Sequence, residues 1–186
     1  MERFRVVKQI GRGAFGAALL VQRKPSIDDS PSSLETTTTK INEQYVIKKI
    51  DVSCLSRQES LEAQNEVKVL AQLAHIKHGN PFIIGYHSAF VEKGSLHILL
   101  NYAENGDLSQ AITKTKNSNR QFRQPQILDW FVQISSALKF VHGKNILHRD
   151  LKTQNVFLDR NWTVKLGDFG IAKVLTSTTA KANTMV

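Results

Sequence analysis

Cysteine is almost absent from this chain of 186 residues: Cys54 is the only one, and there are four prolines and two methionines. A single thiol forms no internal disulfide and no four-thiolate zinc site, which excludes the disulfide-stapled secreted domains and the common zinc modules. No apolar run approaches the roughly 20 residues that cross a bilayer, and Met1–Arg5 lacks the apolar core of a signal peptide. We therefore expect an intracellular, cytoplasmic protein without a membrane partner.

Acidic residues are scarce relative to basic ones, 16 against 25, which gives a formal net charge of +9. A basic balance is compatible with a nucleic acid, an anionic membrane or a phosphorylated ligand. The lysines and arginines are spread along the chain without a long run, so we expect a solvated basic surface and no nucleic-acid partner. His75 and His78 lie close in sequence but lack companion ligands, so no histidine metal site is predicted. The length suits one domain or two small lobes.

Glycines at a regular spacing follow the first predicted strand. Phe4–Ile10 is predicted to be a strand, Ala17–Arg23 a second one, and Gly11, Gly13 and Gly16 lie between them. Glycines at this spacing let backbone N–H groups approach a phosphate, because no Cβ intervenes. A dinucleotide-binding turn shares the spacing but needs a helix directly afterwards. The apolar residues after Gly16 continue as a strand, which favours a phosphate-covering flap.

The next segment, Lys24–Asn42, is rich in Ser, Thr and Pro and has too few apolar residues to pack. We interpret it as a flexible surface insertion, with regulation by phosphorylation as the alternative. Gln44–Ile50 follows as a strand that carries Lys48. Lys49 is predicted to point to the opposite face of that strand.

A helix is predicted to begin at a capping box formed by Ser56 and Glu59. Glu66 is expected at the edge of its apolar face, within reach of Lys48. Pro81–Tyr86 and Ser95–Tyr102 are predicted strands. The residues expected to form the apolar face of the helix are Leu61, Val67, Leu70, Ala71 and Ala74.

A second helix is predicted to begin at Pro125, because proline is favoured at the first helical position, and to end before Gly143. Its wide apolar stripe is typical of a core-facing helix. The stripe consists of Ile127, Phe131, Ile134, Leu138 and Val141.

The strongest signal lies at His148–Asn155 and Asp168–Gly170, with the spacing H-R-D-x-x-x-x-N and then D-F-G. This spacing resembles the catalytic loop and metal-binding motif of protein kinases, and the glycine flap, Lys48 and Glu66 precede it in the matching order. Lys152 resembles the serine/threonine kinases. The segments that resemble the NIMA-related (Nek) kinases are 104–108, 127–134 and 166–172.

The resemblance implies an α+β protein-kinase-like fold with two lobes. It predicts an N-lobe and hinge over 1–103, with a five-stranded antiparallel sheet and helix C, and a partial, helical C-lobe over 104–186. The 24–42 insertion falls between two N-lobe strands. The chain stops in what would be the activation segment, without the A-P-E motif, so we expect a truncated kinase domain whose helix stripe after Pro125 would face water.

The resemblance also implies a site for ATP and Mg²⁺. Asp150 would accept the proton of the substrate hydroxyl, Lys152 would neutralise charge on the transferred phosphoryl group, and Lys48, fixed by Glu66, would hold the α- and β-phosphates. Asn155 and Asp168 would be the metal ligands. The residues expected around the nucleotide are Ile10, Gly11, Arg12, Gly13, Ala14, Phe15, Gly16, Ala18, Val46, Lys48, Leu100 as gatekeeper, Asn101, Ala103 and Phe157.

Regulation and specificity follow only from the resemblance. Thr184 would be the activation-loop phosphosite, with Arg149 pairing with its phosphate, and Ile171 hints at threonine over serine acceptors. Ala18 stands where the flap pattern has valine, which offers adenine less apolar surface. The implied partners are protein substrates with Ser/Thr acceptors, and the implied settings include the cytoskeleton, centrosome and cilium.

Two functions therefore remain open. The first is an ATP-dependent protein serine/threonine kinase. The alternative is a catalytically weak or inactive kinase-derived module that binds nucleotide or docks on a partner.

Overall fold

The structure is a computed structural model that describes residues 3–13, 16–24, 43–76, 79–170 and 172–174. The chain divides into two compact units, each described by itself below. The first unit comprises Met1–Ser60 and Gly85–Tyr102, and the second comprises Leu61–Ile84 and Ala103–Val186.

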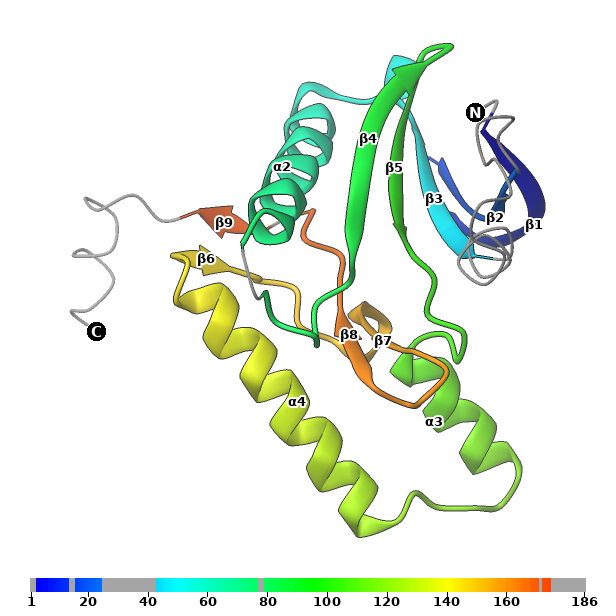
Figure 1. Ribbon diagram of the computed structural model, residues 1–186, viewed down its shortest axis with the longest axis vertical. Coiled ribbons are helices and arrows are strands. Elements are labelled where there is room, and N and C mark those ends of the chain that lie inside the picture. The colour runs from blue at the N-terminus through cyan, green and yellow to red at the C-terminus, as the bar shows by residue number, and fades with distance from the viewer. Residues whose placement is uncertain (1–2, 14–15, 25–42, 77–78, 171, 175–186) are drawn as a thin grey trace, which may run out of the picture. The chain divides into compact units, whose positions relative to one another are not determined.

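The first unit is a five-stranded sheet in which every neighbouring pair is antiparallel (Figure 1). The order across the sheet is β1-β2-β3-β5-β4, so the predicted α+β class and the antiparallel sheet are confirmed. A short 3-10 helix, η1 (Val52–Cys54), follows β3. The strands are β1 (Phe4–Gly13), β2 (Gly16–Arg23), β3 (Gln44–Asp51), β4 (Tyr86–Glu92) and β5 (Ser95–Asn101).

The two faces of this sheet follow the two-residue period of the strands. Val21, Ile47 and Leu99 are buried together on one face, and partly buried Phe4, Leu19 and Tyr45 pack against them. The adjacent residues Val46 and Lys48 point to the opposite face, because successive side chains alternate. One apolar cluster thus orders the sheet and leaves the other face for Lys48.

Helix α2 (Arg57–Ala74) begins at the predicted capping box. Ser56 N–H donates to Glu59 Oε2 at 2.8 Å, and Glu59 N–H donates to Ser56 Oγ at 3.3 Å. The predicted apolar face is right in part, since Leu70 is buried and Val67 and Ala71 are partly buried, but Leu61 (53% exposed) and Ala74 are exposed. The buried residues are Ala63, Glu66, Val69, Leu70 and Leu73, so Glu66 lies within the buried face and not at its edge.

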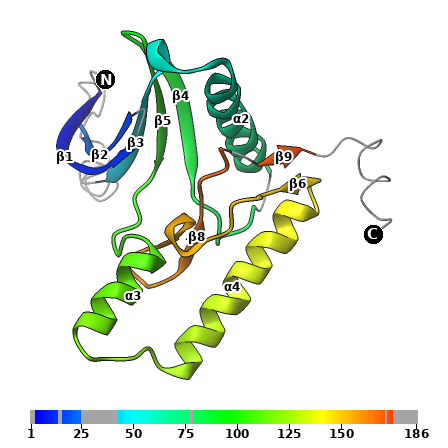
Figure 2. The same ribbon diagram turned by 180° about the vertical axis from the view of Figure 1, so that it is seen from behind.

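Two further helices belong to the second unit, and Figure 2 shows both from behind. Helix α3 (Leu108–Asn117), which the sequence analysis missed, is capped by Asp107, whose carboxylate accepts from Gln110 N–H. Helix α4 (Gln124–His142) has Pro125 in its first turn, as predicted.

The buried face of α4 differs from the predicted stripe. Trp130, Gln133, Ala137 and Val141 are buried, whereas Phe131 is 68% exposed. Ile127, Leu128 and Val132 are also exposed. Trp130 is fixed by its indole N–H, which donates to Trp162 O at 2.8 Å.

The predicted strand over Pro81–Tyr86 is wrong. Ile83 makes only an isolated bridge to Leu166, and Leu166 N–H donates to Phe82 O at 2.7 Å. Phe82 and Ile83 therefore pair with Leu166 within the second unit, before the chain enters β4. The second unit also holds two ribbons, β6 (Ile146–Leu147) with β9 (Lys173–Val174), and β7 (Val156–Leu158) with β8 (Val164–Leu166), besides the 3-10 helix η2 (Thr153–Asn155).

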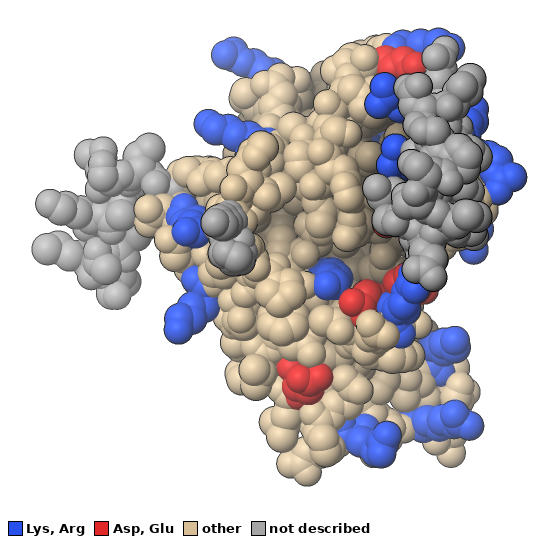
Figure 3. Space-filling model, in the orientation of Figure 1, with Lys and Arg blue, Asp and Glu red and all other residues tan. Residues whose placement is uncertain are grey.

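The surface carries its positive charge in scattered positions. In the face shown in Figure 3, Lys and Arg side chains lie apart from one another and outnumber the acidic ones. Within the described residues, no helix has both the length and the apolar character needed to cross a lipid bilayer.

Candidate active site

His148 anchors the loop that follows β6. Its imidazole is 2% exposed, and Nδ1 accepts from Asp150 N–H at 3.3 Å. Since Nδ1 accepts, the ring proton lies on Nε2, which donates to Gly167 O at 3.0 Å. One imidazole therefore ties the Asp150 loop to the segment that precedes Asp168.

The Asp150 carboxylate is held by two donors from its own loop. Lys152 Nζ lies 2.7 Å from Asp150 Oδ2, and Asn155 Nδ2 donates to the same oxygen at 2.9 Å. The hydrogen bond from Lys152, followed by that from Asn155, keeps the pKa of Asp150 below its usual value. The same contact raises the pKa of Lys152. An ionised, oriented carboxylate beside an ammonium can accept a proton from a hydroxyl while the ammonium stabilises nearby negative charge.

Asn155 links this loop to the second motif. Its side chain is 4% exposed, and Nδ2 also donates to Asp150 O at 2.9 Å. The backbone of the same residue accepts from Gly167 N–H at 3.0 Å. Because Nδ2 is occupied by Asp150, Oδ1 is the amide atom that fits a hard cation, for which amide and carboxylate oxygens are suitable ligands.

Arg149 and Asp168 have left-handed backbones, with φ of 63° and 58°. Few residues other than glycine adopt this region, and such strain is concentrated at functional sites. Among the described residues, no group of three or more His, Cys, Asp and Glu side chains gathers around a possible metal. Asp168 and Asn155 fit Mg²⁺ nonetheless, because this ion is usually held by few protein ligands together with phosphates.

Phe169 is fully buried, and its ring centroid lies 4.8 Å from that of His148. The buried carboxylate of Glu66 comes close to the same turn. A Cβ built on Gly170 would lie 3.7 Å from Asp168 Oδ1 and 3.9 Å from Glu66 Oε2. Two carboxylates thus border Gly170 within the second unit, whereas the predicted pairing of Glu66 with Lys48 stays a prediction.

In the first unit, several predicted nucleotide contacts share one face of the sheet. Ala18 is the direct cross-strand partner of Lys48, and Val46 is the partner of Leu100. Val46 and Lys48 are two residues apart on β3 and therefore point the same way. The face presents an ammonium beside small and apolar side chains, which suits a purine with its phosphates.

Different physical reasons explain why glycine occupies each position of the flap. A Cβ on Gly16 would lie 1.9 Å from Lys49 O, so the close approach of β3 requires glycine there. A Cβ on Gly11 would make only an ordinary contact, 3.5 Å from Ala18 Cβ. The fold thus explains Gly16, while Gly11 remains available to a ligand. The strands also continue further than predicted, to a Gly13–Gly16 pair.

The remaining predicted contacts are distributed over both units. Asn101 N–H donates to Gly85 O at 2.8 Å in the first unit. Ala103, in the second, is buried, and its carbonyl accepts from Gly106 N–H at 3.2 Å. Phe157 lies on β7, and its ring would be 3.0 Å from a Cβ on Gly167. Ile10 and Arg12 lie exposed on β1. Ala14, Phe15, Ile171 and Thr184, like most of the 24–42 insertion, lie outside the described residues.

Sequence reasoning gave no role to the side chains of His148 and Phe169, although both lie in its motifs. It also missed Asn65, which contacts the segment after Asp168. If the burial of Glu66 had been predicted, Asn65 would have been noticed as the residue next to it in the chain.

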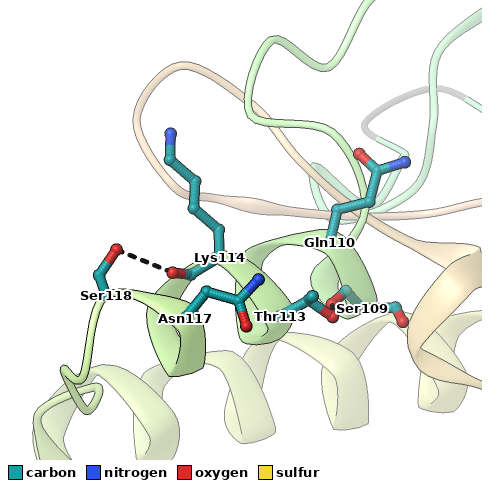
Figure 4. Close-up of a pocket in the computed structure, with 6 residues that line it drawn as sticks. All are labelled: Ser109, Gln110, Thr113, Lys114, Asn117 and Ser118. Carbon is teal, nitrogen blue, oxygen red and sulfur yellow. Dashed lines mark hydrogen bonds between the residues drawn. The ribbon is translucent and has the colours of Figure 1, made fainter.

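A shallow hollow lies on α3, outside the sequence motifs that contain the predicted site residues (Figure 4). Ser118 Oγ donates there to Lys114 O at 3.0 Å. Its lining residues are of polar types and come from one helix and the residue after it, and none of the predicted site residues takes part. The lining residues are Ser109, Gln110, Thr113, Lys114, Asn117 and Ser118.

Comparison with known proteins matches residues 4–186 to the protein kinase domain. The chain is 44% identical over 186 residues to the serine/threonine-protein kinase Nek1 of Mus musculus, which covers all of this chain and 14% of that protein. It is 41% identical over 189 residues to the probable serine/threonine-protein kinase nek3 of Dictyostelium discoideum, covering 100% of this chain and 15% of the relative. Over 187 residues it is 38% identical to human Nek5, covering 100% and 23%. The chain thus spans a quarter or less of the length of these relatives.

Proposed function

This chain belongs to the protein kinase domain family, with Nek serine/threonine kinases among its relatives, and we propose that it transfers the γ-phosphate of ATP to Ser or Thr hydroxyls of proteins. The observation that carries the proposal is the geometry around Asp150. Its carboxylate is ionised, partly exposed and held by Lys152 and Asn155 at hydrogen-bond distance.

Asp150 is proposed to act on the acceptor hydroxyl. Its carboxylate accepts the hydrogen bond of that hydroxyl, orients the oxygen toward the γ-phosphorus, and receives the proton as the new O–P bond forms and the bond to ADP breaks. Lys152 stabilises the negative charge of the phosphoryl group in transit. Because phosphoryl transfer requires mainly positioning and charge stabilisation, these two side chains supply most of what the loop contributes.

Asn155 and Asp168 are proposed to hold Mg²⁺ through Oδ1 and a carboxylate oxygen. The ion, when bound, neutralises charge on the phosphates. Asn155 would serve two purposes, since its Nδ2 orients Asp150 while its Oδ1 would be a ligand of the ion. Lys48 is proposed to bind the α- and β-phosphates as a point charge, and the backbone around Gly11 to approach them without a Cβ.

A kinase-derived interaction module is the second candidate. It is favoured by the exposure of Ile127 and Phe131 on α4, at 52% and 68%. Such adjacent apolar residues on a helix are typical of protein contact surfaces. For either function we propose a cytoplasmic setting with protein partners, and for a Nek-type kinase the cytoskeleton, centrosome or cilium.

The test is phosphate transfer from labelled ATP to a generic basic protein, followed by identification of the labelled amino acid. We expect phosphoserine or phosphothreonine and no phosphotyrosine. Lys48→Met should abolish most of the transfer by weakening phosphate positioning, whereas Lys49→Met, on the opposite sheet face, is the matched control and should retain it. Binding of Mg·ATP without transfer, in this chain and in a version extended past Val186, would refute the enzyme and support the module.

A further inference from the structure

Asn65 on α2 forms a hydrogen bond far outside its own helix. Its Nδ2 donates to the backbone oxygen of Ala172 at 2.7 Å, across 107 residues of sequence, in a partly buried position. Both residues belong to the second unit. Figures 1 and 2 agree in placing α2 beside β9, the strand that begins one residue after Ala172.

Ala172 is where the Asp168 turn meets the β6–β9 ribbon. Its N–H donates to Phe169 O at 3.0 Å, and the residue is 3% exposed. The next two residues, Lys173 and Val174, pair with Leu147 and Ile146, directly before His148. The carbonyl that Asn65 binds thus lies at a junction between the Asp168 turn and the strand that leads into the catalytic loop.

Asn65 also precedes Glu66, whose carboxylate borders Gly170 from the helix side. Two successive residues of α2 therefore face this segment: Asn65 binds Ala172, and the Glu66 carboxylate lies near Gly170. Such a double contact fixes the rotation of the helix about its axis, because turning α2 would withdraw both side chains together.

We propose that Asn65 is a positioning residue, which clasps α2 to Ala172 and thereby holds the preceding residues Asp168–Gly170 in their catalytic arrangement. The assignment of that arrangement to catalysis rests on the proposed kinase function. The contribution of Asn65 to stability does not depend on the kinase function. Asparagine is a poorer helix former than leucine, so its place inside α2 opposes local propensity and is compensated by the bond to Ala172.

The test compares Asn65→Leu and Asn65→Asp in the full chain. Both lose the N–H donor, but the first raises helix propensity and the second retains the side-chain shape. Gln72→Leu is the matched control, because Gln72 is an exposed carboxamide on the same helix. Hydrogen exchange is measured at the amides of Ala172, Lys173 and Val174, together with Tm and the kcat and KM for ATP.

We expect both Asn65 variants to speed exchange at these amides about three- to tenfold, the range that loss of one neutral hydrogen bond produces, while Gln72→Leu leaves it unchanged. Tm of Asn65→Leu should stay near that of the wild type, and kcat should fall several-fold with little change in KM. Unchanged exchange in Asn65→Leu, or an effect confined to Asn65→Asp, would overturn the clasp. If exchange rises but the wild-type chain transfers no phosphate, the clasp stands and the kinase function fails. If exchange rises and kcat does not fall, the positioning role is refuted.

Discussion

The two units of this chain place their predicted site residues in different ways. In the first, Ala18, Val46 and Lys48 lie on continuous strands, and cross-strand register fixes their common face. In the second, Asp150 and Asp168 lie in irregular segments, and individual hydrogen bonds of side chains hold them. In a sheet, many backbone hydrogen bonds together fix the positions of the side chains, whereas in a loop a few contacts fix them. We therefore expect single substitutions in the second unit to act by displacing site residues. In the first unit we expect them to act mainly through steric clashes.

Among the residues that support the site without acting on the substrate hydroxyl, the largest effect is expected at Asn155. Asn155→Leu removes both bonds to Asp150 and the proposed metal-ligating oxygen, so kcat should fall about hundredfold or more. Steady-state transfer assays measure it, with exposed Gln154→Leu as the neighbouring control. A kcat within twofold of the wild type would show that the loop does not depend on this side chain.

The glycines of β1 and β2 test the steric side of the comparison. Gly16→Ala should lower the free energy of unfolding by about 3 kcal/mol, because its Cβ would meet the Lys49 carbonyl at 1.9 Å. Gly11→Ala should change it by less than about 0.5 kcal/mol, since its Cβ has room. The free energies of unfolding of the two variants are measured by urea denaturation. Equal values would contradict the inference that the fold requires glycine at position 16.

A pH effect should distinguish the sheet from the loops. Burial, and next the charge of Lys49, lower the pKa of His97 from 6.5, with Glu92 acting the other way. The unfolded chain therefore binds a proton first as pH falls, so stability is full above pH 6.5 and declines below it. His97→Phe should flatten this decline in Tm between pH 7.5 and 5, as the histidine already stacks on Phe90. If Tm declines equally in His97→Phe and the wild type, other groups cause the loss of stability at low pH.

The smallest effect is expected at Ala18. Ala18→Val adds two methyl groups to the face that carries Lys48 and should lower KM for ATP about fivefold. Ala17→Val, on the opposite face beside Lys49, is the control and should not alter KM. Equal changes in both would mean that this face does not contact the nucleotide.

Sequence reasoning predicted β1, β2, β3 and β5, because alternation and glycine spacing are local signals, but it placed a strand at Pro81–Tyr86 where the structure has β4 at Tyr86–Glu92. It also predicted where α2 and α4 begin, from a capping box and an early proline. It placed the buried faces of both helices correctly only in part, at Leu70 of α2 and Val141 of α4, since it counted apolar residues alone. The true faces include Glu66 and Gln133. Gln133 has a partner in a distant segment, because Val164 N–H donates to its Oε1.

The catalytic residues were recognisable from motif spacing, but their support was not. Left-handed backbones at Arg149 and Asp168 have no local signal, because neither is a glycine. The contact of Asn65 with Ala172 crosses 107 residues and depends on how α2 turns. Phe82–Ile84 was predicted as a strand on composition alone, whereas long-range pairing with Leu166 determines its structure.

The most direct measurement concerns Asp150. The affinity for Mg·ATP and the rate of phosphate transfer are measured for the wild-type chain and for Asp150→Asn, which retains the side-chain shape but cannot take the proton. We predict an unchanged affinity and a rate lower by about 10²- to 10⁴-fold, the usual contribution of a catalytic base. A transfer rate equal to that of the wild type would contradict the account.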